Sequence, residues 1–222
     1  MQIDSDHRQP ETALPALADY QSYVRGCFDD ARALGKSLVR LSIPAPSVPL
    51  LSDPDGSTMW CWPGHAMVVG KGSVCSFEGR GDDRLETVKA AAEELWLELF
   101  DQPHERCHAD PARLYGGLSF APVELEGPWS VFGQARFELP ELLYGKRGDS
   151  AWLSLCVPVD SSPETALQRL LQEQGRLLLH SPVPPRQAQI ERAEHLETQA
   201  WNERIDSIQH LIESGEVHKI VA

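Results

Sequence analysis

The sequence predicts an α+β protein in which helices pack on a largely antiparallel sheet. Two observations predict this class. Extended segments follow one another directly, with Gly, Pro and Asp between them, as they do in hairpins. The helical patterns do not alternate with each strand, as they would around a parallel sheet, and the chain contains no internal repeat.

Composition excludes several classes of function. Hydrophobic residues make up 41% and charged residues 24% of the 222 residues, which is ordinary for a soluble globular chain. The formal net charge of −13 argues against a nucleic-acid partner, because no basic stripe is present to contact phosphates. No segment approaches the ~20 apolar residues that span a bilayer, and the polar, acidic N-terminus lacks the pattern of a signal peptide. We therefore expect no membrane partner.

The cysteines indicate a reducing compartment. Their number is odd and they are scattered along the chain, which favours unpaired thiols in a cytoplasmic protein. The five positions are Cys27, Cys61, Cys75, Cys107 and Cys156.

Apolar spacing and turn residues predict the elements of the first half. Residues 1–18 are expected to form a flexible lead, and residues 19–222 the folded part of the chain. A helix is predicted over 20–35, ended by Gly35, and a strand over 36–46, closed by prolines. Two short strands are predicted over 65–79, with a hairpin turn at Gly70-Lys71-Gly72. The first helix would bury Tyr20, Val24, Cys27, Phe28 and Leu34.

A second helix is predicted over 84–100, because its apolar residues share one face and alanine favours helix intrinsically. Residues 135–144 and 149–159 then form a hairpin around Gly145–Asp149. Ser162 and Pro163 supply the N-cap and first position of a third helix. A proline-rich linker follows, and then a helix over about 189–214 ended by Gly215. Two apolar stripes are expected to be buried: Leu85, Val88, Ala92, Leu95, Trp96 and Leu99 on the second helix, and Trp201, Ile205, Ile208, Leu211 and Ile212 on the last.

Two short motifs invite a chemical interpretation and favour a structural one. His104, Cys107 and His108 offer metal-binding atoms, but no partner pair lies at a suitable spacing, so an exposed loop is the favoured interpretation. Tyr115-Gly116-Gly117, inside an extended run, indicates a bulge or a close approach between backbones.

Lys219 is the candidate catalytic residue. If residues 216–222 form a strand, Val217, Lys219 and Val221 point to one face and the remaining side chains to the other, so that both faces are mostly apolar. A buried lysine tends to lose its proton because desolvation lowers its pKa, and it can then act as a general base. The alternative is a solvated lysine at a frayed chain end.

The motifs together resemble a known family. "ARLYGGLSF", then "WSVFGQARFELPELL", then "IESGEVHKIVA" are similar to the N-terminal half of isochorismate synthases, within the chorismate-utilising enzymes that include anthranilate and salicylate synthases. The resemblance covers roughly residues 60–222 and implies half of the anthranilate-synthase-like chorismate-binding fold. It also implies that a C-terminal half follows, so that the chain is expected to be a truncated piece, inactive alone.

The resemblance implies a role for Lys219 as the base that activates water for addition to C2 of chorismate, with loss of the 4-hydroxyl. It also implies Mg²⁺, held by residues of the missing half. Chorismate and that half are the expected partners, and self-association through exposed apolar surface is a further expectation. The alternatives are a non-catalytic half-domain that binds a partner or a separate C-terminal half, and a salicylate synthase. Whether the product would enter menaquinone or siderophore biosynthesis stays open.

Overall fold

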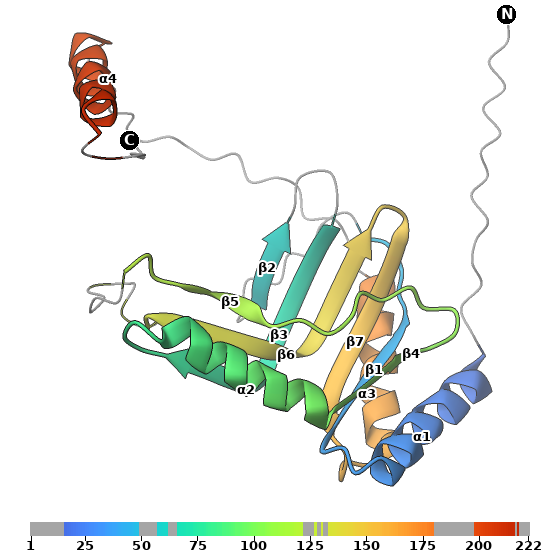
Figure 1. Cartoon of the computed structure of the whole chain (residues 1–222). Coiled ribbons are helices and arrows are strands. Elements are labelled where there is room, and N and C mark those ends of the chain that lie inside the picture. The colour runs from blue at the N-terminus through green and yellow to red at the C-terminus, as the bar shows by residue number, and fades with distance from the viewer. Residues whose placement is uncertain are drawn as a thin grey trace, which may run out of the picture. The chain divides into compact units, whose positions relative to one another are not determined.

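The computed structural model describes residues 16–48, 57–61, 66–121, 127, 130, 133–179, 198–215 and 217, with the side chains of 57–61 and 66 left aside. The chain divides into two compact units, Met1–Val183 and Pro184–Ala222. The first unit carries the sheet and three helices, and α4 is the described helix of the second (Figure 1). The elements in chain order are α1 (Leu17–Ala33), β1 (Leu38–Pro44), β2 (Ser57–Cys61), β3 (Ala66–Gly79), α2 (Arg84–Glu98), β4 (Leu99–Pro103), β5 (Tyr115–Leu118), β6 (Ala135–Arg147), β7 (Ser150–Pro158), α3 (Pro163–Leu178) and α4 (Thr198–Glu213).

The predicted α+β class with a mostly antiparallel sheet is confirmed. Within the described residues the sheet has seven strands in the order β2-β3-β6-β7-β1-β4, and β5 pairs with β6 off this path. Each of these pairs is antiparallel except β1 with β4, which run parallel with Leu38 opposite Leu99. β1 therefore lies between a parallel and an antiparallel neighbour, and the sheet is mixed at this end.

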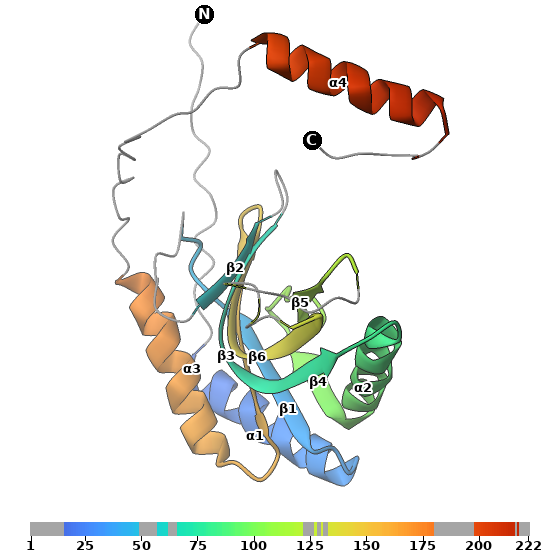
Figure 2. The ribbon, with the colours of Figure 1, turned by 90° about the vertical axis from the view of Figure 1, so that its left-hand side faces the viewer.

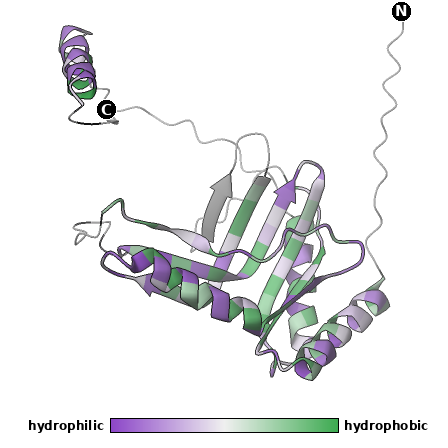
Figure 3. Cartoon of the chain, in the orientation of Figure 1, coloured by the Kyte–Doolittle hydropathy of each residue, from purple (hydrophilic) through white to green (hydrophobic). Residues whose placement is uncertain are grey.

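Helices cover both faces of the sheet. α1 and α3 pack on one face, where Phe28, Leu41, Leu155 and Leu170 are fully buried in the main hydrophobic core. On the opposite face, Leu95 of α2 packs in a smaller cluster with three other buried residues, Leu99, Leu139 and Cys156. The edge-on view in Figure 2 shows α1 and α3 on one side of the strands and α2 on the other. Figure 3 shows hydrophobic bands on the central strands and alternating polar and apolar residues on α1 and α2.

Local sequence signals set several boundaries as expected. The Ser162 hydroxyl caps α3 by accepting a hydrogen bond from the Thr165 amide at 3.3 Å, and Pro163 occupies the first helical position. The β6–β7 hairpin turns at Gly148-Asp149, with Arg147 opposite Ser150 and Gly148 at φ 58°. Gly35 and Gly215 have φ of 66° and 75°, the left-handed conformation that ends helices.

The predicted hairpin at Gly70-Lys71-Gly72 is wrong. Residues 66–79 form one long strand, β3, because β6 pairs with it on both sides of these glycines, from Ala66 with Arg147 to Gly79 with Ala135. The sheet accommodates the irregular sequence by a register shift between Ser73 and Cys75, next to Gly72 at φ 67°. Pairing with a long partner strand thus overrides a local turn signal.

The second helix ends earlier than predicted, at Glu98, and Leu99 begins β4. Parallel pairing with β1 converts these residues to strand. The helix buries Val88 and Leu95 as expected, whereas Leu85 and Trp96 are exposed, at 49% and 39%. On α1, Leu34 is also exposed, because it lies past the last turn at the C-cap.

The last helix confirms the predicted element but not its buried stripe. α4 covers Thr198–Glu213, and the expected residues 189–197 lie outside the described part of the chain. None of its side chains is buried, and Trp201 and Ile212 are 42% and 41% exposed. The amphipathic pattern does form a helix, but no other described element of its own unit covers the apolar face.

Candidate functional site

The candidate base, Lys219, lies outside the described residues, and so does most of its predicted strand. The described chain leads up to it through the end of α4. There the Gly215 amide donates to the Ile212 carbonyl at 3.1 Å, and the Val217 amide donates to the Leu211 carbonyl at 3.3 Å. These bonds satisfy carbonyls of the last helical turn.

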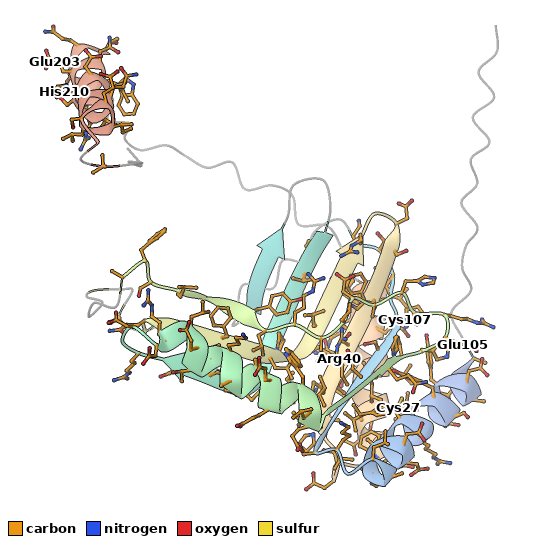
Figure 4. The ribbon with its side chains drawn as sticks, viewed as in Figure 1. Cys27, Arg40, Glu105, Cys107, Glu203 and His210 are labelled. Carbon is orange, nitrogen blue, oxygen red and sulfur yellow. The ribbon has the colours of Figure 1, made fainter. Side chains whose placement is uncertain are left out.

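A buried ionic cluster lies on the α2 side of the sheet, around Arg40 of β1. This guanidinium, only 5% exposed, donates from Nη1 to both carboxylate oxygens of Asp101 at 3.0 and 2.8 Å. Its Nη2 donates to the Asp110 carbonyl at 2.9 Å and to the Ser154 hydroxyl at 3.0 Å. The Ser154 hydroxyl also shares a 2.8 Å hydrogen bond with Ser42. Arg40, which is labelled in Figure 4, thus joins β1 to β4, to β7 and to the segment that follows β4.

The segment 104–114 covers this cluster. The Ala112 amide donates to Asp101 Oδ2 at 3.0 Å, and Arg147 donates to the Asp110 carboxylate at 2.6 Å. The cavity beneath it, lined by Arg40, Tyr115 and Trp152 among others, measures only about 10 Å³. That volume corresponds to about one water molecule. The cluster therefore holds the segment on the sheet and leaves no room for an organic substrate.

A larger hollow lies between α1 and α3. Its volume is about 240 Å³, and its lining includes Val24, Leu167 and the ion pair of Arg25 with Glu164 at 3.2 Å. Both members of this pair are largely exposed, at 65% and 66%. Exposed ion pairs contribute little to stability. Because Glu164 already neutralises Arg25, this arginine does not offer the hollow a free positive charge for an anion.

The motif at residues 104–108 is not the exposed loop that was predicted. His104 and Cys107 are buried, at 4% and 6% exposure, whereas His108 is exposed. The imidazole contacts the rings of Tyr20 and Tyr23, and the thiol packs with Val68, Leu143 and Trp152 in an apolar cluster. Backbone bonds draw the segment inwards, since the His104 amide donates to the Ser42 carbonyl at 2.9 Å.

The backbone approach predicted at Tyr115-Gly116-Gly117 is confirmed. A Cβ on Gly116 would lie 2.0 Å from the Arg136 carbonyl oxygen and 2.6 Å from Phe137 Cα, on the paired strand β6. Only glycine fits at this contact.

Four thiols are free among the described residues, at Cys27, Cys75, Cys107 and Cys156. Burial raises the pKa of Cys27 and of Cys107 to about 11, and that of Cys156 to about 12. Because the thiolate is the reactive form, these groups are poor nucleophiles at neutral pH.

The described residues contain no group of three or more His, Cys, Asp or Glu side chains that could hold a metal ion. The Mg²⁺ implied by the family resemblance therefore has no ligand set in this part of the chain. Among the same residues, no helix is both long and apolar enough to cross a bilayer.

Comparison with known proteins identifies the family. Residues 54–222, more than half of the chain, match the family of chorismate binding enzymes. This chain is a member of that family. A solved structure, the menaquinone-specific isochorismate synthase MenF from Escherichia coli, is similar at 18% identity, with a TM-score of 0.39, over 73% of this chain. The chain spans 36% of the length of that protein. No curated protein sequence matches it at a significant level.

In this member of the chorismate binding enzyme family, the sequence patterns did not predict the cluster around Arg40. A signal was present, because Arg40 and Ser42 alternate with Val39, Leu41 and Ile43 along β1. Such alternation indicates a polar face, here buried under the segment 104–114. The partners Asp101 and Ser154 are far away in sequence, so only the sheet order brings them together.

Proposed function

We propose that the protein containing this chain is an isochorismate synthase and that Lys219 is its water-activating base. The observation that carries this proposal is the family match, which extends to residue 222 and so includes Lys219-Ile220-Val221. A lysine that leads a Lys-[Ile/Val]-Val strand resembles the water-adding members of the chorismate-utilising enzymes. The activity is proposed for the whole protein, of which this chain supplies the lysine.

The proposed reaction is a reversible isomerisation that is balanced in atoms and charge. The oxygen of water bonds to C2 of chorismate while the ring double bonds shift and the C4–oxygen bond breaks. The neutral Lys219 amine takes a proton from the attacking water, and the departing 4-hydroxyl takes a proton from an acid elsewhere in the protein. A positioned base of this kind contributes typically 10²–10⁴-fold to rate.

The base must be neutral before water binds. Lysine has an ordinary pKa of about 10.4, so a dry pocket or a nearby cation has to lower it. The mostly apolar sequence on both sides of Lys219 favours such a pocket. Ammonia needs no base to be nucleophilic, which is why a lysine at this position favours water addition over amination.

Mg²⁺ stays a prediction of the resemblance. Since the described residues offer no ligand set for it, no step of the proposed reaction is assigned to the metal. The described sheet and helices have a supporting role in this proposal, and the reacting groups lie outside them.

The test is a product assay on the whole protein with chorismate. The proposal predicts isochorismate as the product, formed without release of pyruvate. Release of pyruvate with salicylate would identify the alternative synthase, which shares the water-adding lysine. If the protein consumes no chorismate but binds a separate polypeptide that restores turnover, it is a half-domain of a split enzyme, and the catalytic proposal for this protein alone fails.

A further inference from the structure

His104 occupies the turn that fixes the segment 104–114 to the sheet. Its amide donates to the Ser42 carbonyl of β1 at 2.9 Å, and its carbonyl accepts from the Cys107 amide at 2.7 Å. Further along the same segment, Arg40 holds the Asp110 carbonyl and Asp101 holds the Ala112 amide. Hydrogen bonds therefore fix the segment to the sheet near both ends, and His104 is the residue at the first of these contacts.

The imidazole is buried in a site that suits its neutral form. It is 4% exposed and packs edge-on to Tyr20 and Tyr23, with ring centroids 5.5 and 5.2 Å away. Its Nδ1 atom accepts a hydrogen bond from the Arg106 amide at 3.2 Å, so this nitrogen carries no proton. Both neighbouring phenol oxygens have other partners, since Tyr20 accepts from Gln174 and Tyr23 donates to the Gln102 carbonyl.

The charges around the ring come from two elements. Asp19 on α1 and Glu105 beside the ring favour the protonated form, and Arg106 opposes it. Tyr20, Tyr23 and Cys107 are the other titratable groups that face this region, and their burial raises the pKa of each, so they stay neutral. Burial is the largest effect on His104 itself, and it lowers the pKa of the imidazole below its usual value of 6.5.

We propose that His104 is a proton-sensitive latch: a proton taken from solvent onto Nδ1 breaks the hydrogen bond from the Arg106 amide and releases the turn that starts the segment 104–114. Protonated Nδ1 is a donor that faces another donor, so the turn must open. The aromatic rings of Tyr20 and Tyr23 can attract a cation, but they cannot replace the lost acceptor. When the turn opens, this end of the segment 104–114 lifts from the Arg40 cluster that it covers, while the sheet stays folded.

Two measurements on the intact chain test the latch. The first is an NMR titration of the histidine ring protons, with the His104 signal assigned by its loss in a variant. The latch predicts that the native pKa of His104 lies below 6.5. The second is amide hydrogen exchange at Arg106 and Cys107 between pH 7 and pH 5, corrected for the intrinsic rates. If opening of the turn is coupled to uptake of one proton by His104, the protection factors of these amides should fall by up to about tenfold per pH unit.

His104→Asn is the matched variant, because an asparagine Oδ1 takes the place of Nδ1 as an acceptor and does not titrate. We expect its protection at Arg106 to stay constant over the same pH range. His108→Gln, which removes the exposed neighbouring histidine, is expected to keep the pH dependence of the unaltered chain. If His104→Asn does not fold, the titration and the pH dependence of amide protection in the unaltered chain decide together.

Three results would overturn the latch. One is a native pKa of His104 at or above 6.5. Another is constant protection in the unaltered chain. The third is an equal loss of protection in His104→Asn, which would assign the effect to the carboxyl groups of Asp19 or Glu105.

Discussion

One guanidinium nitrogen of the buried Arg40 lies 3.0 and 2.8 Å from the two carboxylate oxygens of Asp101, whose side chain is 22% exposed. This pair bridges the two parallel strands β1 and β4, and the other guanidinium nitrogen reaches β7 and the segment 104–114. A single buried cation therefore joins three regions that lie far apart in sequence: β1, β4 with the segment that follows it, and β7.

Removing one partner of this pair is expected to be costly. In Arg40→Met, Asp101 keeps its hydrogen bond from the Ala112 amide but loses its buried cationic partner. Breaking such a pair typically costs about 3–5 kcal/mol, and the partial exposure of Asp101 places the expected loss of unfolding free energy at the lower end. Chemical denaturation measures it. Lys89→Met, which breaks an exposed pair with Glu93, is the control and should change stability by less than about 1 kcal/mol. Equal effects in the two variants would show that the buried pair is unimportant.

Gly145 is expected to tolerate no side chain. A Cβ at this position would lie 2.1 Å from Cε2 of Trp152, which is 1% exposed on the neighbouring strand β7. Gly145→Ala must displace a packed indole, and overpacking of this kind costs about 1–3 kcal/mol. Gly175→Ala is the matched control, since no atom lies within 4 Å of its added Cβ and alanine favours the helix α3. Thermal unfolding should show opposite shifts for the two variants. A Gly145→Ala protein as stable as the unaltered chain would refute the contact.

Glu141 links the sheet to α3 through Arg169, which donates from Nη2 to the carboxylate at 2.8 Å. This guanidinium lowers the pKa of Glu141 below its usual value of 4.5. The folded state therefore binds a proton less readily than the unfolded state, so the pair contributes stability above pH 4.5 that is lost as the pH falls through the lowered pKa. Between pH 6 and pH 3, the free energy of unfolding should fall less steeply with decreasing pH in Arg169→Gln than in the unaltered chain. The effect is small because both side chains are partly exposed. Identical slopes would exclude the pair as a source of acid sensitivity.

The thiols should react in order of burial. Cys156, with a pKa raised to about 12 and 2% exposure, is expected to be modified by a maleimide at pH 7.5 only as the chain unfolds. Cys75 is only half-buried and should react first among the four described thiols. Peptide mass spectrometry over time checks the order. Modification of Cys156 before Cys75 in folded protein would contradict the packing of β7.

Elements whose boundaries depend on interactions between residues close in sequence were predicted correctly. The Ser162-Pro163 start of α3, the hairpin of β6 and β7, and the close approach at Gly116 follow from capping, turn and steric rules that act over a few residues. The hairpin predicted at Gly70-Lys71-Gly72 is wrong because pairing with the long strand β6 determines the conformation of these residues. Leu99 lay in a helical pattern, yet pairing with Leu38 across the sheet made it a strand residue.

The site was predictable only in part. The alternation around Arg40 indicates a polar face, but burial of that face depends on a segment more than sixty positions away in the chain. His104 and Cys107 carry no sequence signal of burial, since their cover comes from α1 and from β3, β6 and β7. The apolar neighbours of Lys219 and the family resemblance predict its role, and its structural surroundings lie beyond the described residues.

The most direct measurement of the central claim is the rate of isochorismate formation by the whole protein with Lys219→Met. The account predicts a loss of about 10²–10⁴-fold in kcat, because the attacking water then has no proton acceptor. Lys89→Met, on the exposed face of α2, should retain the unaltered rate. Isochorismate formed at the normal rate by Lys219→Met would contradict the assignment of this lysine as the base.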